Sequence, residues 1–337
     1  MRRFLKYFIC LFIVIGNFTT VSAASSISYS YYDEIISKTD WDNMSRSERI
    51  AYCQLSKDTL NKISTNNLLN IVLDYPFIID VYAFDNIDYG IDLVKNQYNG
   101  LEELLSRDDL DEVLLNHASI ASYSLNDYNT IFTNNCFTYL LSSDTLKSVL
   151  STQEQVEIET KILKNKTKSN ATAYANTFSQ ANQLSGGIST FATATVKTPK
   201  GSSITVINNQ SIADFSSTEK SSLDKKMKQA YPSITLVSAA TKKYNCHSYT
   251  WYSQSTSNYY WINDPSKYMT DKSYSKTDIS VGVKVYHTDN SHSAIVTSVG
   301  SGNMLSLKYK SKWGQCGVYI YYASESPYTS SQTFWTR

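Results

Sequence analysis

The sequence predicts an α+β protein with two domains. Three observations lead to this fold class. Residues 25–165 carry apolar side chains at helical intervals, residues 166–192 are small and polar without clear periodicity, and the last hundred residues contain short runs of β-branched side chains. We therefore expect an all-α domain of unassigned role over 25–165, a linker over 166–192, and a second domain over 193–337 that packs a helix on a small antiparallel sheet.

Start and stop signals divide the helical domain. Ser45 and Glu48 have the spacing of a capping box and precede apolar residues at helical intervals, which predicts a helix there. Another helix should begin near Thr65, and Pro76 should interrupt it because proline cannot donate a backbone hydrogen bond. An amphipathic helical pair is expected over 89–117, and one final helix over 143–164.

The second domain begins with a hairpin and a short helix. Residues 193–208 alternate on both sides of Pro199, Lys200 and Gly201, which predicts two strands and a tight turn. A helix capped by Ser217 or Thr218 and a short strand complete the part up to residue 238. In the core of the domain, residues 240–325, a helix should start near Cys246 and precede four strands, at about 279–288, 292–300, 303–313 and 317–324.

The N-terminus predicts export. A cationic start, an apolar run of about ten residues and small residues up to Ala23 have the order of a secretory signal peptide over 1–23, too short in its apolar core for a membrane span. We expect an extracellular protein, with or without association to the cell wall, that does not contact membrane after cleavage. The net charge of +1 argues against a nucleic-acid partner. Oligomeric state is left open.

Four cysteines remain after the expected cleavage: Cys53, Cys136, Cys246 and Cys316. The chain contains no CxxC or HxxxH pair, so the sequence predicts neither a structural zinc site nor a cofactor. Whether Cys53 and Cys136 form a disulfide is left open. Cys316 is expected in a hairpin turn as a thiol without a role in chemistry.

Cys246 is the predicted nucleophile. At the first turn of a helix, free backbone N–H groups and the helix dipole favour the thiolate. His247 is adjacent in sequence, but neighbouring helical residues point about 100° apart, so it is expected to line the cleft or pack beside the nucleophile rather than act as the base. His292 opens a predicted strand and is preferred to His287 as the base. His117 lies in the helical domain and is expected to be structural.

A helix that starts at Cys246, a valine-rich strand, and a strand that begins His292-Ser-Ala-Ile-Val resemble the core of the papain-like peptidoglycan hydrolases, which include the NlpC-type endopeptidases and the CHAP amidases. The resemblance covers about 240–325. It implies a Cys246 nucleophile, a His292 base and a polar residue on the next strand that orients the imidazole, for which Ser311 is the best placed of Ser306, Ser311 and Gln315. The oxyanion would be bound by the backbone N–H of Cys246 and a donor from Tyr244 or Asn245.

Aromatic residues near this core have two interpretations. In the first, they line a groove for a peptide or a glycan stem. In the second, they fill the core of a tyrosine-rich chain. The residues concerned are Trp251, Tyr259, Tyr260, Trp261 and Trp313. The three tryptophans are the candidates for the substrate groove.

The sequence therefore predicts a secreted thiol hydrolase that cleaves an amide bond in peptidoglycan peptides. Two alternatives stay open. The run Asn245-Cys246-His247-Ser248 departs from the Asp-Cys-Ser-Gly of the NlpC-type enzymes, which favours a non-catalytic interaction protein with a degenerate hydrolase domain. The same chemistry also suits a peptidase, transamidase or deamidase that acts on proteins.

Overall fold

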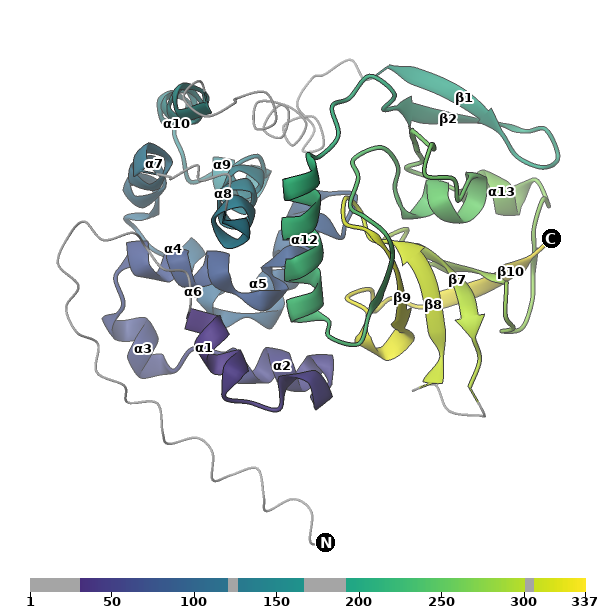
Figure 1. Ribbon diagram of the computed structural model, residues 1–337. Helices are drawn as coiled ribbons and strands as arrows, with labels where there is room; N and C mark the ends of the chain where they lie inside the picture. The colour runs from purple at the N-terminus through teal and green to yellow at the C-terminus, as the bar shows by residue number, and fades with distance from the viewer. Residues whose placement is uncertain (1–30, 121–126, 167–191, 301–305) are drawn as a thin grey trace, which may run out of the picture.

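The computed structural model describes residues 31–120, 127–166, 192–300 and 306–337. The expected signal peptide and nearly all of the expected linker lie outside these residues. Helices occupy the first half of the described chain and two antiparallel sheets occupy the second, as the sequence predicts for an α+β fold (Figure 1).

The helices of the first half are short. They are α1 (Tyr31–Ser37), η1 (Trp41–Asn43), α2 (Arg46–Tyr52), α3 (Lys57–Lys62), α4 (Thr65–Asp74), η2 (Pro76–Tyr82), α5 (Ile87–Gln97), α6 (Asn99–Leu105), α7 (Leu110–Ile120), α8 (Tyr128–Leu140), α9 (Asp144–Lys147) and α10 (Thr152–Lys166). The capping box of Ser45 and Glu48 is present at the start of α2. Pro76 ends α4 and begins the 3₁₀ helix η2, as expected.

The structure has two helices where the sequence predicts one. We predicted a continuous helix over 143–164, but α9 ends at Lys147 and α10 begins at Thr152. The reason is a second capping arrangement, in which the backbone N–H of Glu154 donates to Ser151 Oγ and the Glu154 carboxylate accepts from the backbone N–H of Ser151.

The second half contains two sheets. The smaller has the order β1-β2-β4, from β1 (Thr193–Lys197), β2 (Ser203–Asn208) and β4 (Tyr260–Trp261). The larger has the order β3-β9-β8-β7-β6-β10-β5, from β3 (Thr235–Ser238), β5 (Ser275–Lys276), β6 (Lys284–His287), β7 (Ser293–Ser298), β8 (Lys308–Lys312), β9 (Val318–Tyr322) and β10 (Gln332–Thr336). The helices of this half are α12 (Ser217–Ala230), η3 (Ser248–Tyr252), α13 (Ser266–Thr270) and η5 (Ala323–Glu325).

Most of these elements match the sequence prediction. The hairpin of β1 and β2 turns at Gly201, whose φ of +86° lies in the left-handed region that glycine tolerates. The four strands β6 to β9 pair consecutively and antiparallel. The cap of α12 is Ser216 rather than Ser217 or Thr218, because its hydroxyl forms a capping box with Glu219. The sequence missed β10, which pairs with β6 and β5.

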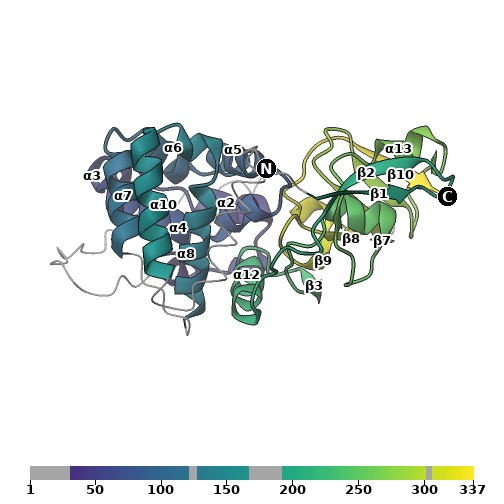
Figure 2. The ribbon, with the colours of Figure 1, turned by 90° about the horizontal axis from the view of Figure 1, so that it is seen from above.

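One apolar core continues through both halves. It includes Tyr32 and Leu114 of the helical half, Met227 of α12, and Trp313 and Tyr328 of the sheet half. Figures 1 and 2 show α12 between the helices and the large sheet. The turn after β8 packs closely on the helical half, since a Cβ at Gly314 would lie 2.3 Å from the carbonyl oxygen of Tyr82.

Candidate functional site

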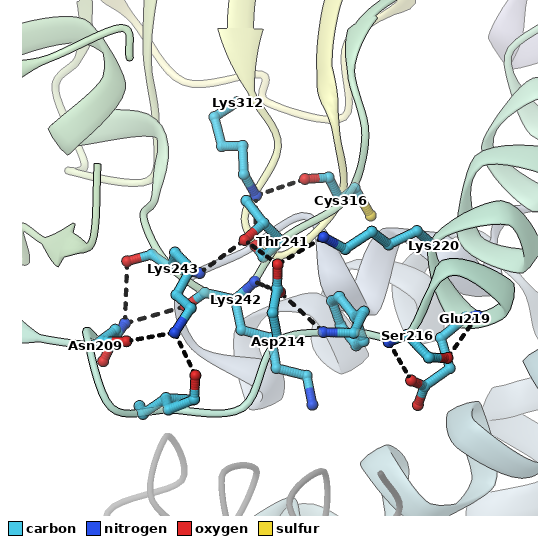
Figure 3. Close-up of polar contacts among 12 residues, drawn as sticks. Asn209, Asp214, Ser216, Glu219, Lys220, Thr241, Lys242, Lys243, Lys312 and Cys316 are labelled. Atoms are coloured by element: carbon cyan, nitrogen blue, oxygen red, sulfur yellow. Dashed lines mark hydrogen bonds and ion pairs between the residues drawn. The ribbon is translucent and has the colours of Figure 1, made fainter. Parts of the chain in front are cut away.

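A polar network fixes the loop that leads to Cys246 (Figure 3). The Asp214 carboxylate accepts hydrogen bonds from the Thr241 hydroxyl at 2.9 Å and the Lys242 backbone N–H at 3.0 Å. Lys312 is fully buried, and its ammonium group donates to three backbone carbonyls, those of Thr241, Gly314 and Cys316. Burial lowers the pKa of Lys312 to about 8. The loop therefore joins the helical turn at Cys246 to the hairpin of β8 and β9.

Cys246 begins a short helix, as predicted. Cys246 and His247 are α-helical, and the chain continues as the π-helix η3. Asn245 precedes the helix, and its side-chain oxygen accepts from the backbone N–H of Ser248 at 3.0 Å and of Ile262 at 3.2 Å. π-Helical turns are rare and often lie at functional sites, because the wider turn changes the direction of the side chains.

The thiol of Cys246 is enclosed. The residue is 1% exposed, and burial raises the pKa of its thiol well above the ordinary value, with a further contribution from the nearby Asp85 carboxylate. The backbone N–H groups of Ser293 and His247 donate to the sulfur, and these hydrogen bonds act to lower the pKa of the thiol. Burial dominates, so the resting group is a neutral thiol and not the thiolate that its place at a helix start suggested.

His292 is held from one side only. Its Nε2 lies 2.8 Å from the Ser311 hydroxyl and 3.2 Å from the Tyr321 hydroxyl, and these two oxygens are 2.9 Å apart. Its Nδ1 is buried and has no hydrogen-bond partner among the described residues. The ring of Tyr328 stacks on the imidazole, with centroids 3.6 Å apart. Burial lowers the pKa of His292 well below its ordinary value, so the imidazole is neutral.

Ser311 therefore lies where the orienting residue was expected, in contact with Nε2 of His292. In the described part of the chain Cys246 and His292 form no hydrogen bond with each other, since the sulfur takes its donors from the backbone and Nδ1 is unpartnered. The link between the two residues is Ser293, which follows His292 in the chain and directs its backbone N–H at the sulfur.

Hydrogen bonds at both ring nitrogens fix the orientation of His247. Its Nε2 lies 3.1 Å from the carbonyl oxygen of Asn290, so this nitrogen carries the proton and donates it. Its Nδ1 accepts from the Ser293 hydroxyl at 2.8 Å, and the same hydroxyl accepts from the Trp251 indole at 2.8 Å. Burial lowers the pKa of His247 to about 4. His247 is fully buried and lines no open cleft in this conformation.

The predicted oxyanion donors and groove residues are buried. The Asn245 amide donates to Asp85 Oδ2 at 2.6 Å and to the Ile262 carbonyl at 2.7 Å, so neither proton is free for an oxyanion. Tyr244 is buried and stacks near Tyr249. The groove expected from tryptophans is not present, because all three fill the core, with exposed fractions of 3% for Trp251, 3% for Trp261 and 0% for Trp313. The core interpretation is correct for these residues in a chain so rich in tyrosine.

His287 lies beside His292, and His117 lies in the helical half. His287 contacts Ser330 and Gln332 through its two nitrogens, and its ring centroid lies 5.6 Å from that of His292. His117 is buried against Phe137 in the helical half. Cys53, Cys136, Cys246 and Cys316 are all free buried thiols, and Cys316 lies in the turn between β8 and β9.

Sequence reasoning missed Asp85. This residue lies between η2 and α5 and comes 160 positions before Asn245, yet its Oδ2 accepts from the Asn245 amide. A carboxylate oxygen of Asp85, the sulfur of Cys246 and a ring nitrogen of His247 all lie within 4.8 Å of one another. These atoms are the kinds that hold a metal ion. No motif in the sequence marks this aspartate, because the contact depends on how the helical half packs against the sheet half.

Comparisons of the chain with protein-family models, curated proteins and solved structures found no match. In the part of the chain that the structure describes, no helix is both long and apolar enough to span a membrane.

Proposed function

We propose that the protein is a secreted thiol hydrolase with a papain-like catalytic arrangement, which cleaves an amide bond in peptidoglycan peptides. Cys246 is the nucleophile, His292 the general base, and Ser311 the residue that orients the imidazole. The observation that carries the proposal is the state of His292. Its Nε2 contacts two hydroxyls while its Nδ1 is buried and unpartnered, and the backbone N–H of the next residue contacts the Cys246 sulfur.

The protonation states define the first step. A neutral thiol and a neutral imidazole are the resting pair, because burial disfavours both charged forms. When Nε2 carries the proton and donates it to Ser311 or Tyr321, Nδ1 is free to accept the thiol proton. The sulfur then attacks the amide carbonyl carbon, and a carbon–sulfur bond forms as the imidazolium appears.

The later steps return the enzyme to its starting state. The imidazolium gives its proton to the leaving amine as the carbon–nitrogen bond breaks, which leaves a thioester on Cys246. Water, with His292 again as the base, hydrolyses the thioester and restores the thiol. Because Tyr328 covers His292 and the thiol is enclosed, substrate entry requires these covering residues to move.

The test compares wild type with the Cys246→Ala variant on muropeptides and on a mixed protein pool, with products identified by mass spectrometry. Cys316→Ala is the matched control, since Cys316 is an equally buried free thiol to which the proposal gives no catalytic role. We expect new amino groups from muropeptides with wild type and Cys316→Ala, and none with Cys246→Ala. Equal release by wild type and Cys246→Ala would end the proposal, and cleavage restricted to the protein pool would move the activity to protein substrates.

The enclosure of Cys246 favours a second candidate function, a secreted interaction protein with a degenerate hydrolase domain. A buried neutral thiol is inert in many proteins. Iodoacetamide labelling of the native protein separates the candidates. A hydrolase that opens should be labelled at Cys246 before Cys53, Cys136 and Cys316, whereas an inert core should give no preference.

A further inference from the structure

We propose that Asp85, Cys246 and His247 form a binding site for one divalent ion of the zinc class, which holds the nucleophile in an inactive form. The metal site itself rests on the geometry, and its inhibitory effect rests on the proposed function. The ligand atoms lie within 4.8 Å of one another, and they combine the sulfur, nitrogen and oxygen donors that Zn²⁺ accepts.

The Asp85 carboxylate gives the first independent argument for a cation. Its Oδ2 accepts a hydrogen bond from the Asn245 amide, but its Oδ1 is shielded from solvent and has no hydrogen-bond partner in the part of the chain that the structure describes. No lysine or arginine forms an ion pair with it in the described chain, and the nearby Lys312 is occupied by three carbonyl groups. A buried carboxylate is costly unless it is paired or bound to a metal, so a cation near Oδ1 would remove this cost.

The His247 ring gives the second argument. Histidines that bind metals usually donate their other ring N–H to a carbonyl or carboxylate, which fixes the ring. His247 already donates from Nε2 to the carbonyl of Asn290. Its Nδ1 accepts from the Ser293 hydroxyl, and rotation of that hydroxyl would free Nδ1 while the Ser293 oxygen still accepts from the Trp251 indole. Nδ1 is therefore the nitrogen that would bind the ion.

Small movements suffice to close the site. Tetrahedral zinc with bonds of about 2.0–2.3 Å requires ligand atoms roughly 3.3–3.8 Å apart. In the structure, the ligand atoms of Asp85, Cys246 and His247 lie within 4.8 Å of one another. Three protein ligands leave the fourth position for water. Asp85 as a residue is only half-buried, so an ion would enter on its side.

Binding would block catalysis reversibly. On coordination the Cys246 thiol releases its proton to solvent, and the thiolate becomes a metal ligand. The sulfur lone pair is then no longer available for attack on a carbonyl. Removal of the ion and return of the proton restore the resting thiol.

The test measures metal affinity directly on the full mature protein. Zn²⁺ is titrated in competition with a chromophoric chelator, and Co²⁺ replaces it to give a spectrum. We expect one ion per chain and a thiolate-to-Co²⁺ charge-transfer band. Asp85→Asn, Cys246→Ser and His247→Gln should each weaken binding at least about 100-fold, since they remove direct ligands. Cys316→Ser, a buried thiol outside the cluster, should bind within about twofold of wild type.

Circular dichroism of each variant shows whether it is folded, and Asp85→Asn keeps the shape of the side chain and an acceptor for Asn245. Wild-type affinity no higher than that of a folded Asp85→Asn variant overturns the site. A charge-transfer band that persists in Cys246→Ser also overturns it, because the band reports a different sulfur.

Hydrolysis assays with and without Zn²⁺ separate this proposal from the proposed function. Loss of hydrolysis on metal binding and recovery with chelator support both. Hydrolysis that continues when the metal site is fully occupied overturns the inhibitory role of the ion. Absence of hydrolysis both with and without bound metal removes the proposed function and with it the inhibitory role, while the metal site would still be supported by the Co²⁺ spectrum.

Discussion

Asp80 and Asp85 lie on one short stretch of chain, and each is the centre of a polar cluster. The two clusters differ in how many oxygens of the buried carboxylate have a hydrogen-bond partner. Both oxygens of Asp80 are paired, one with Arg46 at 2.8 Å and one with the Tyr231 hydroxyl at 2.6 Å. Asp85 accepts from the Asn245 amide at one oxygen, and no described residue forms a hydrogen bond with the other oxygen. Burial raises the pKa of both groups, that of Asp85 to about 7.

This difference distinguishes a cluster that stabilises the fold from a candidate functional site. The Asp80 cluster links α2, η2 and the residue after α12, so its satisfied hydrogen bonds hold the two halves together. Natural interiors seldom leave polar atoms unpartnered. Among the unpartnered buried atoms of the described residues, Asp85 Oδ1 belongs to a residue near Cys246, and His292 Nδ1 belongs to the residue before Ser293, whose backbone N–H contacts the Cys246 sulfur. We place function there because both atoms are connected to this one thiol.

The largest effect is expected from a matched pair of substitutions in the two clusters. Asp80→Asn should lower the free energy of unfolding by about 3–5 kcal/mol, because it leaves the buried Arg46 without its counter-charge. Asp85→Asn should change it by less than about 1 kcal/mol, since no cation loses a partner. Urea denaturation of both variants measures this, and equal effects would remove the distinction between the clusters.

The next effect concerns the hydroxyls that hold His292. Ser311→Ala should lower amide hydrolysis about 10–100-fold, equivalent to losing about 1–3 kcal/mol, because the closer partner of Nε2 is removed. Tyr321→Phe is the matched control and should have a smaller effect, since its hydroxyl is 3.2 Å from Nε2. A larger loss with Tyr321→Phe would assign the orienting role to tyrosine instead of serine. The readout is kcat/KM on muropeptides over a range of pH.

A third prediction uses His117 of α7, a buried histidine whose ring nitrogens form no hydrogen bond with any described residue. Burial lowers its pKa to about 4, against 6.5 in the unfolded chain, so the unfolded state binds more protons between these values. Its contribution to stability is fully present above pH 6.5 and is lost as the pH falls towards 4, at up to about 1.4 kcal/mol per pH unit. Denaturation of wild type and His117→Phe at pH 5 and pH 7 should show a weaker pH dependence for the variant; an unchanged dependence would contradict the assignment.

The smallest effect is expected at Tyr328, the ring that covers His292. Its hydroxyl donates a hydrogen bond to the Ala83 carbonyl at 2.5 Å. This bond connects Tyr328, and with it the ring that covers His292, to the helical half. Tyr328→Phe should lower the free energy of unfolding by about 1 kcal/mol, the usual value for one hydrogen bond, while the stacked ring is kept. We also expect faster iodoacetamide labelling of Cys246. A labelling rate equal to that of wild type would show that this hydrogen bond does not control access to the thiol.

The sequence alone determined the features that depend on local interactions. The capping box of Ser45 and Glu48, the break at Pro76 and the hairpin around Gly201 follow from residues a few positions apart. The start of a helix at Cys246 and the run of four antiparallel strands were likewise predicted from periodicity. Strand order then places Ser311 near His292, since β7 and β8 are adjacent in sequence and in the sheet.

Only the tertiary structure decided the features that join distant segments. Asp85 reaches Asn245 across the interface of the two halves, and the three tryptophans are buried by neighbours that the local sequence does not specify. The resting state of the thiol was also decided there: a helix start favours the thiolate, but enclosure of Cys246 removes the water that would stabilise its charge. Burial and long-range pairing depend on how whole elements pack, and periodicity along a single segment carries no information about that packing.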